Sequence, residues 1–178
     1  MFDIHFPKNR QQLEAARKRL VTEELVVLNL GMRNLRDHSR GVTSLEITKD
    51  YSKEFESLLP FTMTNAQKRA VSDCINDIIN KSSPLNRLVQ GDVGSGKTAV
   101  AASVCYTVAK NGFQTAFMAP TEILARQHYK TFQKLFENTD IKVGLLTGTL
   151  RESEKKQIRK SLADGSIDMV IGTHALIT

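Results

Sequence analysis

Several residue types are scarce in this chain of 178 residues, and each scarcity excludes a class of protein. Only two cysteines occur, Cys74 and Cys105, which is too few for a disulfide scaffold and typical of a reducing cytosol. No run of about 18 apolar residues is present, so we expect no membrane span. The opening MFDIHFPKNR lacks an apolar core followed by small residues, so we expect no secretory signal. The sequence therefore predicts a cytoplasmic protein with no membrane partner.

The residues that are present give the composition of an ordinary globular protein. Apolar residues make up 40% and charged residues 25%, unlike a disordered chain. The length suits one domain, or one domain with a helical arm. Lysine and arginine outnumber aspartate and glutamate 25 to 19, giving a net charge of +6. That excess permits a nucleic-acid partner without demonstrating one, since many basic proteins bind no nucleic acid.

The N-terminal stretch predicts one long helix from Asn9 to about Asp37, with apolar residues at helical spacing. Basic residues crowd its polar face. A packing arm with a solvated face is the preferred interpretation, and a DNA-contacting helix is the alternative. Gly31 is expected to be a weak point or a break in this helix.

Further along the chain, strands and helices are expected to alternate. Thr64 and Gln67 have the spacing of a capping box, which starts a helix ending near Asn80. Short apolar runs predict strands over residues 88–90, 115–119, 141–146 and 167–171, with helices over 98–111, 121–137 and 152–162. Alternation with short links predicts an α/β fold, a parallel sheet flanked by helices. Ligands of such sheets bind beyond the carboxyl ends of the strands.

A glycine-rich loop is the strongest motif, because GDVGSGKT at 91–98 matches G-x-x-x-x-G-K-[ST] in full. Glycines let backbone N–H groups wrap around phosphate oxygens, and the following helix N-terminus favours anions. Lys97 is expected to reach the β- and γ-phosphates, and Thr98 to ligate Mg²⁺, which makes these two the catalytic candidates. The residues expected to bind the nucleotide are Gly91, Asp92, Val93, Gly94, Ser95, Gly96, Lys97 and Thr98.

Gln67 precedes this loop by 24 residues and carries an amide that can donate to and accept from an adenine edge, which suits ATP over GTP. The alternative is that Gln67 only completes the cap with Thr64, and both roles can hold together. Phe61 could stack on the base, although an aromatic residue beside Leu58 and Leu59 is more often part of a core.

Three further segments follow the later strands at the same expected edge. Threonine hydroxyls and free helix N–H groups suit phosphate-backbone contacts. The alternative for Thr121 is an ordinary helix N-cap. His128 and His174 are too isolated to indicate a metal site. The candidate nucleic-acid contacts are Pro120, Thr121, Thr147, Gly148, Gly172 and Thr173.

Five elements of the sequence, in this order, resemble the motifs of the first motor domain of superfamily 2 helicases. They are Gln67, GDVGSGKT (91–98), APTEILARQH (119–128), LTGTL (146–150) and IGTHALI (171–177). The amino-acid sequence of these motifs resembles the RecG family most, in LPFTMTNAQKRA (59–70) and RLVQGDVGSGKT (87–98). The N-terminal segment 5–30 also resembles the part that joins a DNA-binding wedge domain to the motor in that family.

The resemblance implies an incomplete RecA-like P-loop domain preceded by a long helix. Residues 1–50 would be a helical arm toward a wedge domain, and residues 51–178 the N-terminal part of motor domain 1. The implied activity is ATP-dependent movement on double-stranded DNA, remodelling stalled forks and Holliday junctions in repair and recombination. Gln67 would recognise adenine, ATP and Mg²⁺ would be the cofactors, and the protein would be a monomer.

One departure from the family pattern concerns the acidic D-E-x-[HQ] box, which the chain does not contain. In the family this box supplies the Mg²⁺-binding acid and the carboxylate that activates water. We therefore expect the 178 residues to bind ATP weakly without turning it over. The alternatives are the motor of a transcription-repair coupling factor and a non-catalytic nucleotide-binding module. An RNA helicase fits the later motifs less well, although phosphate contacts alone do not separate RNA from DNA.

Overall fold

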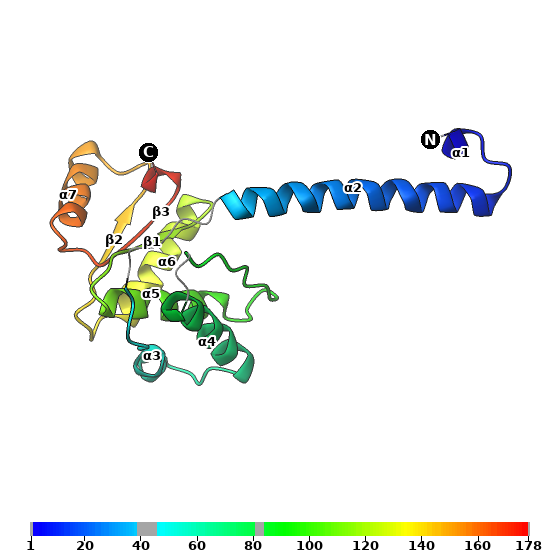
Figure 1. Cartoon of the computed structure of the whole chain (residues 1–178). Helices are drawn as coiled ribbons and strands as arrows, with labels where there is room; N and C mark the ends of the chain where they lie inside the picture. The colour runs from blue at the N-terminus through cyan, green and yellow to red at the C-terminus, as the bar shows by residue number, and fades with distance from the viewer. Residues whose placement is uncertain (1, 39–45, 81–83, 178) are drawn as a thin grey trace. The chain divides into compact units, whose positions relative to one another are not determined.

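The computed structural model describes residues 2–38, 46–80 and 84–177 (Figure 1). The chain divides into two compact units, residues 1–42 and 43–178. Within the described ranges, no helix has the length and apolar character that crossing a membrane requires.

The first unit contains α1 (Phe2–His5) and the long helix α2 (Arg10–His38). Asn9 stands just before α2, and its side-chain oxygen accepts a hydrogen bond of 2.8 Å from the backbone N–H of Gln12. The predicted long helix is confirmed to within one residue at each end. Of the two alternatives for Gly31, a break is wrong, because α2 continues through it, and a weak point stays a prediction. A glycine inside a helix costs only about 1 kcal/mol relative to alanine, too little to interrupt so long a helix.

The second unit is an α/β fold, as predicted, with a parallel sheet of three strands in the order β1-β3-β2. The sheet is preceded by α3 (Ser52–Leu58), α4 (Asn65–Asn80) and α5 (Lys97–Lys110). Its strands are β1 (Thr115–Met118), β2 (Val143–Leu146) and β3 (Met169–Gly172), connected by α6 (Glu122–Leu135) and α7 (Glu152–Ala163). A short 3-10 turn, η1 (His174–Leu176), follows β3.

Helices cover both faces of this sheet. On one face the buried side chains of Met169 and Ile171 join a core cluster with Phe132 of α6. On the other face, a Cβ placed on Gly144 of β2 would lie 3.8 Å from Ile158 of α7. Figure 1 shows α6 and α7 on opposite sides of β2 and β3. Two-sided cover is what a parallel sheet requires, since its strands are apolar on both faces.

Two core clusters hold α5, the helix that begins at the glycine-rich loop. Toward α4, the buried side chain of Val100 packs in a cluster with Val71 and Ile75. Toward the sheet, the ring centroid of Tyr106 lies 5.6 Å from that of Phe55 and 5.6 Å from that of Phe136. The start of α5 is therefore fixed by packing on two sides.

The strand expected at residues 88–90 is absent, and this prediction is wrong. Each strand of the described sheet pairs only with another of the three, with β3 in the middle. A strand exists only through hydrogen bonds to a neighbour, and residues 88–90 have none of these rungs. Leu88 is 88% exposed, whereas Val89 packs against the cluster of α4 and α5.

Candidate functional site

The glycine-rich loop forms a tight turn between the segment after α4 and the start of α5. The backbone N–H of Ser95 donates to the carbonyl of Asp92 at 3.1 Å. Gly94 and Gly96 have φ values of +81° and +82°, in the left-handed region that favours glycine. Gly96, the residue at the N-cap position of α5, has no side chain that could cap the helix. The positive end of the helix dipole therefore faces the loop and favours an anion there.

Lys97 lies across this loop. Its ammonium group donates to the carbonyl oxygen of Gly91 at 2.8 Å and to that of Asp92 at 2.7 Å. The charge is thus held beside the loop, at an exposed position. Thr98 stands in the first turn of α5 and is half-buried. An anion entering the loop would meet the Lys97 ammonium and the amides of α5 together.

Gln67 takes part in two contacts, one with its own helix and one with the loop. Its side-chain oxygen accepts from the N–H of Thr64 at 2.8 Å, and its own N–H donates to the Thr64 hydroxyl at 3.3 Å. The predicted capping box is confirmed. In addition, the Gln67 amide nitrogen donates to the carbonyl of Ser95 at 2.8 Å. These contacts leave the Gln67 amide one N–H and one lone pair with which it could still bind an adenine edge. Adenine recognition by Gln67 therefore stays a prediction.

The sequence also left open whether Phe61 belongs to the core. Phe61 is 50% exposed and lines a cavity of about 490 Å³. The same cavity reaches Gly96 and Thr98 at the loop, and its other walls, mostly apolar, come from residues 58–60, α5 and α6. Phe61 is therefore not a core residue, and it borders a space adjoining the phosphate loop that a flat apolar ring could enter.

The three later segments meet at one edge of the sheet. The parallel register aligns Met118 with Gly172, and Gly172 with Leu146, so that the following residues emerge side by side. The predicted N-cap is confirmed, since the Thr121 hydroxyl accepts from the N–H of Leu124 at 3.3 Å.

Exposure divides the six candidates at this edge. Pro120, Thr121 and Gly148 are exposed, whereas Thr147 is fully buried and Thr173 half-buried. Gly172 is buried inside β3, and a Cβ there would lie 2.1 Å from the carbonyl oxygen of Leu146. The geometry gives Gly172 a packing role, while the exposed three are the ones that a ligand can reach directly.

A polar network that the sequence reasoning missed connects two of these segments. The carboxylate of Glu122 accepts from the hydroxyl of Thr149, and also from the Arg126 guanidinium at 2.9 and 2.8 Å. Arg126 also donates to the Thr149 hydroxyl at 3.2 Å. These hydrogen bonds, the one from Thr149 first, lower the pKa of Glu122. The four-residue spacing of Glu122 and Arg126 is visible in the sequence, but the third partner is not.

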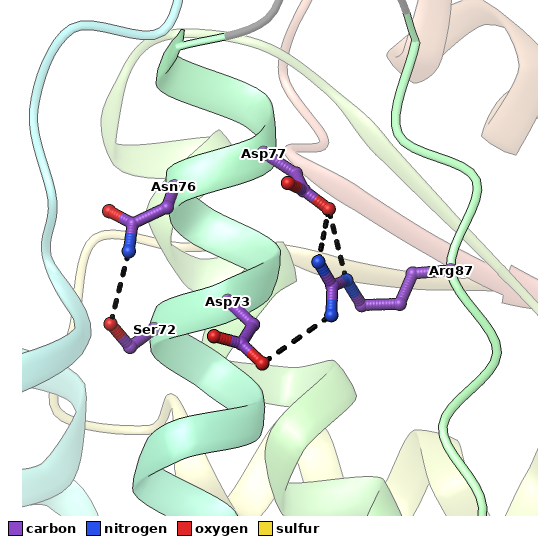
Figure 2. Close-up of polar contacts among 5 residues, drawn as sticks. All are labelled: Ser72, Asp73, Asn76, Asp77 and Arg87. Carbon is purple, nitrogen blue, oxygen red and sulfur yellow. Dashed lines mark hydrogen bonds and ion pairs between the residues drawn. The ribbon is translucent and has the colours of Figure 1, made fainter.

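A second missed cluster lies on α4, where Asp73 and Asp77 face Arg87 from the segment that enters the loop (Figure 2). The Arg87 guanidinium donates to Asp77 through two nitrogens and to Asp73 at 3.4 Å. A pair of acids one helical turn apart is a visible signal. The partner of these acids, Arg87, lies 10 and 14 positions away and is not predicted by any local pattern.

His128, Cys74 and Cys105 are buried or half-buried, whereas His174 is exposed. The His128 ring centroid lies 5.0 Å from that of Phe117, and burial lowers the pKa of His128. Burial raises the pKa of the Cys105 thiol to about 11. Among the residues that the structure describes, no group of three or more His, Cys, Asp or Glu side chains could hold a metal ion.

Comparison with known proteins gives a consistent picture. The family model of the DEAD/DEAH box helicases matches residues 64–178. The chain is 48% identical over 178 residues to the ATP-dependent DNA helicase RecG of Thermotoga maritima, covering 99% of this chain and 23% of that protein. It is 44% identical over 180 residues to RecG of Bacillus subtilis, covering 98% of this chain and 26% of that protein. The chain therefore spans about a quarter of the length of these relatives.

Solved structures agree with these matches. A structure of RecG bound to a three-way DNA junction is similar to this chain with a TM-score of 0.81 and 46% identity, covering 99% of this chain and 24% of that one. A hypothetical ATP-dependent RNA helicase from Sulfolobus tokodaii gives a TM-score of 0.51 at 20% identity, over 71% of this chain and 34% of that one. The second likeness concerns the fold alone.

Proposed function

We propose, on the premise that this chain belongs to the DEAD/DEAH box helicase family, that it forms the ATP-binding part of the first motor domain of a RecG-type DNA helicase. The observation that carries the proposal is the loop 91–98, with Lys97 lying across it at the uncapped start of α5. Likeness to RecG proteins over 99% of the chain, N-terminal arm included, supports this assignment over a transcription-repair coupling factor.

The whole protein, in this proposal, is an ATP-dependent double-stranded DNA translocase that remodels stalled replication forks and Holliday junctions in repair and recombination. We assign residues 1–50 to the helical arm that leads to a wedge domain and residues 51–178 to the motor. We further propose that the protein acts in the cytoplasm as a monomer. The solved RecG complex with a three-way junction supports a branched DNA substrate.

The nucleotide would be held by the loop, by Lys97 and by Thr98. Hydrolysis of the bound ATP would supply the free energy that drives movement. Lys97 would exchange the carbonyls of Gly91 and Asp92 for phosphate oxygens, a stronger partner for an ammonium ion. Mg²⁺ fits this donor set, because it is usually held by few protein ligands together with phosphates and water. Thr98 would be the ligand from this chain, and Gln67 with Phe61 would face the base.

Contacts with DNA would come from the edge where β1, β2 and β3 end. Pro120, Thr121 and Gly148 are exposed there and can meet phosphate groups. Three further residues would support the exposed ones by packing beneath them, since they are buried or half-buried: Thr147, Gly172 and Thr173. Phosphate contacts carry no base sequence, which suits a protein that must move along any DNA.

The proposal is tested first by nucleotide binding to the 178-residue chain, with a fluorescent ATP analogue and Mg²⁺. We expect measurable binding, a loss of more than about tenfold in Lys97→Ala, and no loss in the matched surface variant Lys130→Ala. We also expect no ATP turnover from this chain alone, because it contains no D-E-x-[HQ] sequence. Equal affinity for the ATP analogue in both variants would contradict the proposal that the loop binds the nucleotide.

DNA specificity is tested in the full-length protein that carries this chain. ATPase activity should be stimulated more by a three-way junction than by linear duplex of equal length. Stimulation by single-stranded RNA instead would favour an RNA helicase. Nucleotide binding that no nucleic acid affects would favour a non-catalytic binding module.

A further inference from the structure

The first limb of the phosphate loop has no strand to hold it in the described part of the chain. Residues 88–90 make none of the sheet rungs, and Leu88 is exposed. The second limb is different, because it runs directly into α5, which two core clusters hold. The shape of a loop depends on where both of its limbs are fixed. A side chain of the first limb that pairs with α4 would fix that end of the loop as well.

Arg87 supplies that attachment (Figure 2). Its Nε donates to the Asp77 carboxylate at 3.0 Å, one terminal nitrogen donates to the same oxygen, and the other reaches Asp73 at 3.4 Å. The side chains of Arg87 and Asp77 are only 34% and 16% exposed. Isolated ion pairs on exposed surfaces contribute little, but a guanidinium fork held by two carboxylates has one preferred orientation.

The same helix also contacts the loop near its second limb. The Gln67 amide in the first turn of α4 donates to the Ser95 carbonyl at 2.8 Å. From Gln67 to Asp77 there are ten residues of one helix, which at about 1.5 Å per residue span roughly 15 Å. Since α4 is a rigid element packed on α5 through Val71 and Ile75, it fixes the distance between its contact with the loop at Ser95 and its contact with Arg87, which precedes the loop.

We propose that Arg87 is a positioning residue for the phosphate loop, which it holds against α4 through Asp77 and Asp73. Arg87 does not touch the nucleotide in this proposal. It sets the place of Gly91 and Asp92, the two carbonyls on which the Lys97 ammonium rests. The inference depends on the proposed function only in requiring that the loop bind a nucleoside triphosphate.

The test compares Arg87→Ala, Arg87→Lys and the charge-swapped double variant Arg87→Asp with Asp77→Arg. Arg159→Ala on α7 is the matched control for loss of an exposed arginine. Affinity for a fluorescent ATP analogue is measured with the 178-residue chain, and KM and kcat for ATP with the full-length protein. Thermal unfolding of each variant shows whether it is folded at the assay temperature.

We expect Arg87→Ala to weaken analogue binding about tenfold, less than the roughly 100-fold that a misplacement of about 1 Å can cost. KM should rise more than kcat falls. Arg87→Lys, which keeps the charge and loses the fork, should lie between Arg87→Ala and the wild type. The charge-swapped pair should recover part of the affinity, which a general loss of stability would not allow.

Two results would overturn the inference. One is a folded Arg87→Ala with wild-type affinity and KM, and the other is a charge-swapped pair no better than Arg87→Ala. If Arg87→Ala does not fold, Asp73→Asn decides, since it weakens only the 3.4 Å contact and should still raise KM. Failure of the wild-type chain itself to bind the analogue would instead contradict the proposed function.

Discussion

The phosphate loop and the edge of the sheet are both candidate binding sites, but they are held in opposite ways. The loop is held by side chains, with Gln67 on Ser95, Lys97 on Gly91 and Arg87 on α4. The sheet edge is held by the backbone, because the parallel register fixes where each strand ends. A site held by side chains can adjust when its ligand arrives, whereas a site held by strand register is formed before the ligand binds.

The largest expected effect is at Gly172, and it tests how rigid the sheet edge is. In Gly172→Ala the new Cβ would lie 2.1 Å from the Leu146 carbonyl oxygen, so two paired strands must separate. We expect destabilisation of about 3 kcal/mol, the upper end for added atoms in a packed interior. Chemical denaturation measures it. Gly148→Ala is the matched control at the same edge, since nothing lies within 4 Å of its Cβ. Equal losses in the two variants would contradict the rigid-edge interpretation.

Gly96→Ala is expected to have the next largest effect, at the loop. Its φ of +82° costs an L-residue about 1–2 kcal/mol, and its Cβ would lie 2.3 Å from the Gln67 amide nitrogen. The amide is the end of a flexible side chain and can move. We therefore expect a stable protein that binds the ATP analogue about tenfold more weakly, measured by fluorescence titration. A large loss of stability with unchanged affinity would show that the loop is as rigid as the sheet.

A smaller effect is expected where side chains do contribute to the sheet edge. Glu122→Gln and Thr149→Val each remove part of the network that connects the segment after β1 to the segment after β2. We expect about a threefold loss of affinity for a three-way junction in the full-length protein, with unchanged nucleotide affinity. Fluorescence anisotropy measures the first. Glu152→Gln, which removes a carboxylate paired with Lys155 on α7, is the control for charge alone. Equal losses in Glu122→Gln and Glu152→Gln, with none in the uncharged Thr149→Val, would reduce the effect to net charge.

The smallest expected effect concerns the packing of α5, on which the loop stands. Tyr106 donates to Glu54 at 2.6 Å, and this bond, followed by the one from Lys110, lowers the pKa of Glu54 below its ordinary value of 4.5. A lowered carboxyl pKa contributes stability that is present above the ordinary value and is lost as the pH falls through the lowered one. Tyr106→Phe should reduce the melting temperature at pH 7 by about 3 °C and make the loss below pH 4.5 shallower. Identical acid profiles would exclude the bond as a source of stability.

Local sequence signals predicted most of the elements of this fold. The capping box at Thr64 and Gln67, the N-cap at Thr121 and the long helix from Asn9 depend on residues within four positions of one another, and all three were correct. The strand at 88–90 was wrong because a strand also depends on a partner that is distant in the sequence.

The same distinction applies to the candidate site. The GDVGSGKT loop is contiguous, so the sequence alone contains the whole motif, and nucleotide binding by its residues stays a prediction. The contact of Gln67 with Ser95 spans 28 positions, and that of Glu122 with Thr149 spans 27. No local pattern contains such pairs. The burial of Gly172 and Thr147 could not be predicted either, because a sequence motif does not show which of its residues are buried beneath the others.

By itself, the sequence determined that this protein has a contiguous GDVGSGKT motif, an alternating α/β fold and a basic, cysteine-poor composition. Each of these follows from neighbouring residues or from simple counts. The tertiary structure alone decided which side chains contact the loop, which candidates at the sheet edge are exposed, and that Arg87 pairs with Asp77 and Asp73 of α4. Those properties depend on side chains that meet only after the helices and strands have packed.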